Sequence, residues 1–257
     1  MNLTSVARTK TYLGMTANTS DTVIGQLVAR ASDQVIRWCS NTFERTSHTN
    51  ARYDGFGSAV LRLPDTPVIT VSRVLLGTTS IPASADGIAA GYQFDELNVF
   101  LFGGYLFNSG KRQVGVDYVS GYATTQADYV PAANGPYTIT PTTGGYAAAD
   151  LGVSNTTSGT AYARVVGVPL TGNYSYSEGV YTFNATDTGA AVTMTYDYVP
   201  GAVEQAVIEL VGTSLKQRDN LGVSSRSLRD ESISYSDKDM SDSVKGLLWP
   251  YKKVVPV

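Results

Sequence analysis

The spacing of apolar residues changes twice along the chain. Near both ends apolar residues recur at the helical period, whereas in the long middle part they alternate in short runs, as in strands. The helical pattern predicts a short helix over 4–13 that ends at Gly14, and a second one, capped by Ser20 or Asp21, that runs to Cys39. It also predicts a long helix over 200–218 and a last short one, capped near Ser241–Ser243 and ended by Pro250.

The helix over 200–218 has the widest apolar face. Its apolar residues sweep an arc of roughly 200°, about twice what a helix resting on one surface needs. We therefore expect it to touch a sheet on one side and another helix, or another subunit, on the other. Ile208 and Leu215 lie at the edge of this arc, where a neighbouring molecule could cover them.

The middle of the chain reads as two kinds of β structure. A turn at 53–57 precedes strands at 60–63 and 68–74, and the runs 98–102 and 113–118 suggest a pair around a glycine-rich turn. From 126 to 196 the chain is rich in Thr, Ser, Gly, Ala and Tyr, and its only basic residue is Arg164.

A repeated segment frames this polar stretch, since Asp-Tyr-Val-Pro occurs at 128–131 and again at 197–200. We interpret the stretch as an insertion into a surface loop, where insertions cost little. The predicted fold is α+β: a helical core of two N-terminal helices, a small antiparallel sheet and a long C-terminal helix, with an inserted all-β domain. The predicted domains are 1–125 with 198–257, and a β-sandwich-like module over 126–197.

Composition narrows the function classes. With 19 basic and 22 acidic residues, the chain is not basic enough to hold DNA by neutralising phosphates. It has no apolar run long enough to span a membrane, and its first residues show no secretory signal pattern. The single cysteine, Cys39, excludes an internal disulfide and fits a chain made in a reducing cytoplasm.

The search for catalytic or metal-binding motifs predicts none. His48 is the only histidine; a Ser-His-Asp arrangement around it is formally possible, but no serine lies in a Gly-x-Ser-x-Gly motif. Cys39 lies on the apolar face of its helix, as a packed thiol would. The run 104–111 departs from the phosphate-loop pattern and 237–248 from the calcium-loop pattern. We therefore expect no enzyme activity, cofactor or metal.

The tyrosines of the polar stretch allow two interpretations. Tyr162, Tyr174, Tyr176 and Tyr181 could form a face that binds sugar or protein, or they could be ordinary strand residues covering a small core. The first interpretation would suit a carbohydrate-binding or adhesin-like protein. A serine hydrolase is a further class, although its flanking motifs are missing.

The order of the motifs resembles the head–tail connector (adaptor) proteins of long-tailed bacteriophages. The resemblance covers roughly 3–123 and 199–257. It is carried by Tyr-Asp-Gly-Phe-Gly at 53–57, Leu-Arg-Leu-Pro-Asp-Thr-Pro-Val at 61–68, Phe-Asn-Ser-Gly at 107–110, Val-Asp-Tyr-Val-Ser-Gly-Tyr at 116–122, the helix ending in Lys-Gln-Arg at 216–218, and Leu-Leu-Trp-Pro-Tyr-Lys-Lys at 247–253.

The resemblance implies a structural role in the virion neck. Such adaptors form a ring, usually of twelve copies, beneath the portal protein, and they offer a docking surface to the tail or to a stopper (tail-completion) protein. Double-stranded DNA passes through the ring without specific binding, no membrane is involved, and assembly takes place in the host cytoplasm.

Two sets of residues are predicted to make the contacts of such a ring. Ile208 and Leu215 are the candidates for the ring interface. The C-terminal segment is the candidate for portal binding, through Leu247, Leu248, Trp249, Tyr251, Lys252, Lys253, Val254 and Val255. The alternative is that 247–249 packs back onto the chain's own helices and that the last six residues are disordered.

Overall fold

The computed structural model describes residues 1–17, 20–130, 136–138, 145–218, 225–228, 231–234 and 240–253; for 136–138, 225–228 and 231–234 it describes the backbone only. The chain divides into two compact units. The first comprises Met1–Asn41 and the described part of Thr124–Val254, and the second comprises Thr42–Ala123.

Four α-helices occur among the described residues, and all lie in the first unit: α1 (Val6–Leu13), α2 (Asp21–Cys39), α3 (Gly201–Arg218) and α4 (Asp242–Leu248). The predicted stop signal of the first helix is confirmed, because Gly14 adopts a left-handed φ of 66°. The predicted cap of α4 is also confirmed, since the Ser241 hydroxyl accepts a hydrogen bond from the amide of Val244. Two 3-10 turns complete the helical elements, η1 (Ala185–Asp187) and η2 (Trp249–Tyr251).

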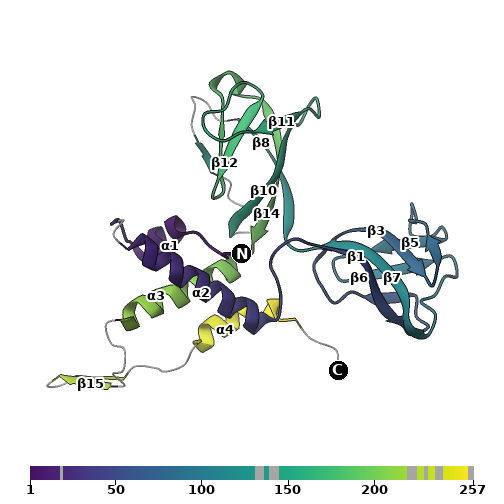
Figure 1. Ribbon diagram of the computed structural model, residues 1–257, viewed down its shortest axis with the longest axis horizontal. Coiled ribbons are helices and arrows are strands. Elements are labelled where there is room, and N and C mark those ends of the chain that lie inside the picture. The colour runs from purple at the N-terminus through teal and green to yellow at the C-terminus, as the bar shows by residue number, and fades with distance from the viewer. Residues whose placement is uncertain are drawn as a thin grey trace. The chain divides into compact units, whose positions relative to one another are not determined.

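Three helices surround α3. It contacts α1, α2 and α4, which gather around it in Figure 1. Its buried side chains cover most of its circumference: Val203, Glu204, Ala206, Val207, Ile208, Leu210 and Val211. The width of the apolar arc was therefore predicted correctly, but the expected sheet beside it is wrong: helices cover α3 instead.

The first unit also contains a seven-stranded sheet in the order β8-β14-β10-β11-β12-β13-β9. The strands are β8 (Ala123–Tyr129), β9 (Pro136–Thr138), β10 (Tyr146–Asn155), β11 (Ala161–Arg164), β12 (Asn173–Ser177), β13 (Val180–Phe183) and β14 (Ala191–Val199). Its core is aromatic and aliphatic, built from Val130, Ala147, Val153, Tyr174, Tyr181, Phe183, Val192, Met194 and Tyr196. A separate hairpin pairs β15 (Ser225–Leu228) with β16 (Glu231–Ser234).

The repeated Asp-Tyr-Val segments lie at the ends of neighbouring strands, because β8 and β14 are adjacent in the sheet. Side chains link the two strands: the Tyr196 hydroxyl donates to Gln126 Oε1 at 2.8 Å, and the Thr125 and Thr195 hydroxyls are 3.3 Å apart. The predicted module boundaries, 126 and 197, both fall inside strands of this pair.

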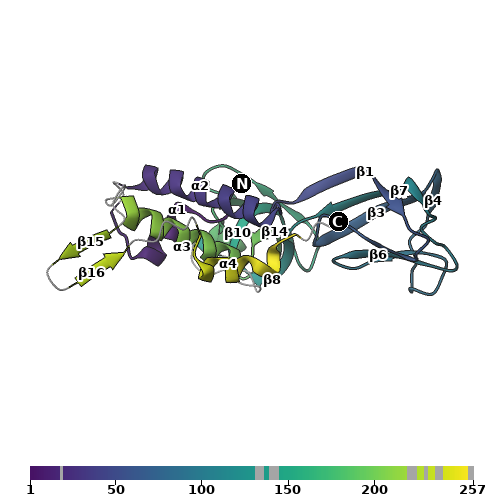
Figure 2. The ribbon, with the colours of Figure 1, turned by 90° about the horizontal axis from the view of Figure 1, so that it is seen from below.

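The second unit consists of two antiparallel sheets, whose long strands are visible in Figure 2. One sheet has the order β1-β7-β3-β4 and the other β2-β6-β5. The strands are β1 (Thr46–Gly55), β2 (Val60–Arg62), β3 (Val68–Leu76), β4 (Thr79–Ile81), β5 (Gly91–Phe94), β6 (Asn98–Phe102) and β7 (Gly110–Ser120).

Both sheets contribute to one core. Val71 and Val116 of the first sheet and Val99 of the second belong to the same buried cluster. The buried hydroxyl of Tyr92 on β5 donates to the Val71 carbonyl oxygen on β3 at 3.1 Å, which ties the sheets together. The sequence-based pairing of 98–102 with 113–118 is wrong, because β6 pairs with β2 and β5, whereas β7 pairs with β1 and β3.

The predicted fold class is therefore wrong. We expected a helical core carrying a small sheet and one inserted β domain, but the chain is mostly β, with strands in both units. The physical reason is that 42–123 closes a hydrophobic core from its own two sheets, with no helix contributing to it. The helices α1–α4 form only part of the first unit.

Candidate functional site

The C-terminal segment 247–253 is held on the chain's own helices. Leu248 is fully buried, and Leu247 is half-buried. The amide of Lys253 donates to the Cys39 carbonyl oxygen at 2.8 Å, and Asn41 Nδ2 reaches the Tyr251 carbonyl oxygen at 3.4 Å. The segment therefore continues past α4 along the C-terminal end of α2. Val254 and Val255 lie outside the described residues.

Two indole rings flank the Lys252 ammonium in this segment. Its Nζ lies 4.9 Å from the centroid of the Trp38 ring and 5.7 Å from that of Trp249, which are cation–π distances. Trp249 remains 69 % exposed. The segment thus presents a large aromatic side chain and a cation on a backbone that is fixed by buried neighbours.

The two residues predicted for a ring interface differ in environment. Ile208 is 5 % exposed and Leu215 is half-buried. Ile208 lines a groove of about 400 Å³ between α1 and α3, which we call the α1–α3 groove. Side chains from both helices line this groove: Arg8, Thr11 and Tyr12 from α1 and Glu204, Gln205 and Ile208 from α3.

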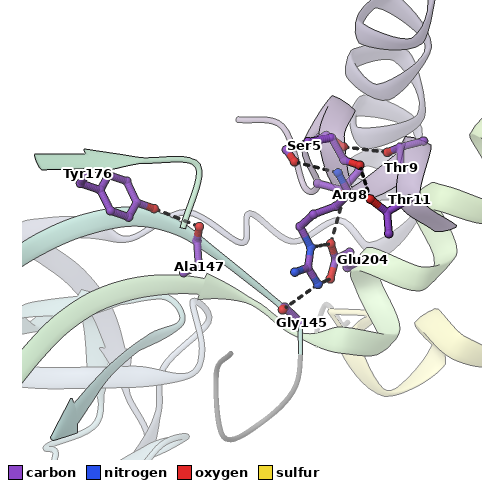
Figure 3. A network of polar contacts seen from close by, with 10 residues as sticks. Ser5, Arg8, Thr9, Thr11, Gly145, Ala147, Tyr176 and Glu204 are labelled. Atoms are coloured by element: carbon purple, nitrogen blue, oxygen red, sulfur yellow. Dashed lines mark hydrogen bonds and ion pairs between the residues drawn. The ribbon is translucent and has the colours of Figure 1, made fainter. Parts of the chain in front are cut away.

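The Arg8–Glu204 ion pair, drawn in Figure 3, forms part of the lining of the α1–α3 groove. The Glu204 carboxylate accepts hydrogen bonds from Arg8 Nε and, at 2.8 Å, from Arg8 NH2. Arg8 NH2 also donates to the Gly145 carbonyl oxygen at 3.1 Å, and the buried Thr4 hydroxyl donates to Glu204 at 3.0 Å. The hydrogen bond to Glu204 raises the pKa of the Arg8 guanidinium, so this group stays charged.

A short loop between β11 and β12 exposes aliphatic side chains. We call Val166–Leu170 the apolar loop. Val166, Val168 and Leu170 are 106 %, 92 % and 70 % exposed, whereas Pro169 is buried. Sequence reasoning missed this loop, although the signal was present: an aliphatic run stands in an otherwise polar stretch.

Hydrogen bonds hold the base of the apolar loop. Asn184 Nδ2 donates to the Pro169 carbonyl oxygen at 2.8 Å, and the Asn173 amide donates to the Leu170 carbonyl oxygen at 2.9 Å. The buried Asp187 carboxylate accepts from the Gly172 amide at 3.0 Å. The loop is thus a braced projection with its apolar side chains in solvent.

The His48 ring does not form a Ser-His-Asp triad. Its Nε2 lies 3.0 Å from the Ser120 hydroxyl and 3.8 Å from the Asp65 carboxylate. A triad needs the serine and the acid on different ring nitrogens, and here both contact the same one. The ring also stacks on Tyr118 at 4.3 Å, so it packs as part of the second unit.

Cys39 is a buried thiol. Burial raises its pKa to about 11, although Lys252 acts in the opposite direction. Among the residues that the structure describes, no group of three or more His, Cys, Asp or Glu side chains could hold a metal ion. No helix in this described part is long and apolar enough to cross a membrane.

The four tyrosines of the polar stretch do not form a common exposed face. Tyr174 and Tyr181 are buried, and both hydroxyls donate to the Asp150 carboxylate, at 2.7 and 2.9 Å. Tyr162 and Tyr176 are partly buried against the same core. The interpretation as ordinary strand residues is therefore the correct one for the buried pair.

Comparisons with known proteins find matches among solved structures. No protein-family model matches the chain, and no curated protein matches it. Among solved structures, the chain is similar to a chain in the neck of an empty GTA particle computed with C6 symmetry, with 13 % identity and a TM-score of 0.39. The match covers 99 % of this chain and 92 % of the other. A TM-score this low does not establish a shared fold.

Proposed function

We propose that this chain is a structural protein of a phage-like virion neck and not an enzyme. In this role it acts as a head–tail adaptor: copies form a ring beneath the portal protein, the tail or a stopper protein docks on the ring, and DNA passes through it. The resemblance of the motif order to adaptor proteins motivates the proposal. The observation that carries it is the segment 247–253, which holds Trp249 exposed on a fixed backbone.

The geometry of this segment suits a protein contact. Tryptophan is among the residue types that dominate binding energy at protein interfaces. Because the backbone hydrogen bonds to Cys39 and Asn41 already hold the segment, a partner would not have to order it, and less entropy would be lost on binding. Lys252 and Lys253 would favour an acidic rim on the partner, and that contribution is sensitive to salt.

The overall charge suits a channel through which DNA slides. Nineteen basic residues against 22 acidic residues leave no excess of positive charge to retain the phosphate backbone.

Substitution of Trp249 tests the proposal. Trp249→Ala should weaken binding to portal-bearing heads by about tenfold or more, the loss typical of an interface hot spot. Its thermal midpoint should stay close to that of the parent, because the indole is 69 % exposed. The measurement is co-sedimentation with the heads over a range of protein concentrations.

Ile88→Ala is the matched control, because Ile88 is 82 % exposed and lies in the second unit. This variant should bind as the parent does. If Trp249→Ala binds as tightly as Ile88→Ala, segment 247–253 is not the portal contact.

A further inference from the structure

We propose that the apolar loop of one copy docks into the α1–α3 groove of a second copy of this chain. This inference rests on the proposed ring function and specifies its subunit contact. It also changes the role of Ile208, which would line the receiving groove.

The apolar loop has a fixed backbone and exposed aliphatic side chains. Ordering a segment costs conformational entropy, and here hydrogen bonds from Asn184 and Asn173 and the buried Pro169 fix a loop whose aliphatic side chains are in solvent. Aliphatic side chains do not stabilise a loop that stays in solvent. Docking of the loop would remove these side chains from water, which is favourable. A braced apolar projection is therefore the form expected of a docking element.

The composition of the apolar loop limits the kind of partner that it can bind. The apolar loop has no charged side chain, so it offers nothing to the phosphates of a nucleic acid or to lipid headgroups. It also has no aromatic ring on which a sugar could stack. The chemistry of the loop suits an uncharged or internally neutralised apolar surface of a protein.

The α1–α3 groove is an apolar surface whose charges neutralise each other. Ile208 and the Tyr12 ring supply apolar lining, and a volume of about 400 Å³ is within the range of sites that enclose compact ligands. The charges in the groove are already paired with each other, since Arg8 donates two hydrogen bonds to Glu204. Arg8 and Glu204 would therefore remain paired when an aliphatic side chain enters the groove.

The contact between the apolar loop and the groove is small and joins two different surfaces. Three aliphatic side chains are far fewer than the ~20–30 residues that each partner contributes to a standard stable interface. The contact would be weak between two copies in solution and effective where copies repeat side by side. Because loop and groove are different surfaces, the contact is head-to-tail, the type that forms a ring when the rotation between successive copies closes.

Cross-linking between variants that each carry one added cysteine tests this contact. Val168→Cys places a thiol on the apolar loop and Thr11→Cys places one in the groove, whereas the native Cys39 is buried. The two variants, made with tags of different size, are mixed at high concentration and also on portal-bearing heads, and are then mildly oxidised. We expect a disulfide between the two variants, with a yield about tenfold or more above background, because docked thiols meet at a high effective concentration.

The matched control is Ser158→Cys, at the exposed turn between β10 and β11. It should cross-link with Thr11→Cys at background yield only, and Val168→Cys mixed with itself should do the same. A yield for Val168→Cys with Thr11→Cys that equals the Ser158→Cys control overturns the proposed contact. If rings still form on the heads in that case, the neck function stands; if no rings form, the neck function fails.

Discussion

Removal of the Arg8 guanidinium should destabilise the first unit by an amount that the structure lets us estimate. The Glu204 side chain is 6 % exposed and accepts hydrogen bonds from Arg8 and Thr4. In Arg8→Met the carboxylate keeps only the Thr4 hydroxyl as a donor. Removing one partner of a buried ion pair costs ~3–5 kcal/mol, but Arg8 is 41 % exposed and water screens the pair, so we expect about 2–3 kcal/mol.

The assay is differential scanning calorimetry of Arg8→Met beside the parent. A loss of this size should lower the midpoint of the first unit by about 5–10 °C, given ~2–4 °C per kcal/mol for domains of similar size. The second unit contains neither residue, so its unfolding should not change. Arg62→Met is the matched control, because Arg62 is an exposed arginine on β2 and its loss should change the midpoint little.

Two further variants test the reason for the loss. Glu204→Gln should cost less, about 1 kcal/mol, because the Arg8 left behind can still reach water. The double variant Arg8→Met with Glu204→Met should be more stable than Arg8→Met alone, since it leaves no buried charge unpaired. Equal midpoints for Arg8→Met and Arg62→Met, or a double variant less stable than Arg8→Met, would refute this reasoning.

Further predictions concern Asp150, Cys39 and the segment 132–199. Asp150→Ala should lower the stability of the first unit by about 2–3 kcal/mol in urea unfolding, because the hydroxyls of Tyr174 and Tyr181 lose their acceptor; Asp33→Ala, which removes an exposed acid on α2, should cost far less. The Cys39 thiol should resist iodoacetamide in the folded chain until the pH approaches 11 and react at pH 9 once the chain is unfolded; reaction of the folded chain at pH 9 would contradict the burial. Because the thiol pKa is raised on folding, its contribution to stability is complete below pH 9 and lost between pH 9 and 11, so the parent should lose more stability over this range than a Cys39→Ala variant. Deletion of 132–199 should leave a folded remainder with its helical circular dichroism; a product that is only aggregated would contradict the predicted insertion.

The helices were predictable because their signals are local. Gly14 needs a left-handed φ that glycine adopts at low cost, and Ser241 supplies an oxygen to the first turn of α4. The wide apolar arc of α3 also showed correctly that several neighbours would cover it. Periodicity measures how much surface is covered, but it does not say whether a sheet or a helix covers it, and that part of the prediction was wrong.

The β structure was harder to predict because strand pairing is set by distant residues. The strands β4 and β5 are three and four residues long, and β5 begins with a glycine, so neither gives a periodic signal. The pairing of β6 with β2 and β5, and of β7 with β1 and β3, depends on which side chains meet in the shared core. Without that information the two sheets appeared as one small sheet on a helical core.

For the candidate surfaces too, local features could be predicted from the sequence, but contacts between distant residues could not. The composition of 247–253 identified the segment, but its attachment to the C-terminal end of α2 could not be seen, because Trp38 and Lys252 are far apart in the chain. The Arg8–Glu204 pair is equally distant in sequence. The apolar loop was visible as a run of aliphatic residues, and only its exposure, measured on the folded chain, distinguishes it from a core strand.

Electron microscopy of portal-bearing heads incubated with the purified chain tests the neck function most directly. The proposal predicts an added ring of density at the portal vertex, built from repeated copies of this chain, which is absent from heads incubated without it. Heads that keep a bare portal at saturating concentrations of folded protein, or density bound elsewhere on the capsid, would contradict a head–tail adaptor.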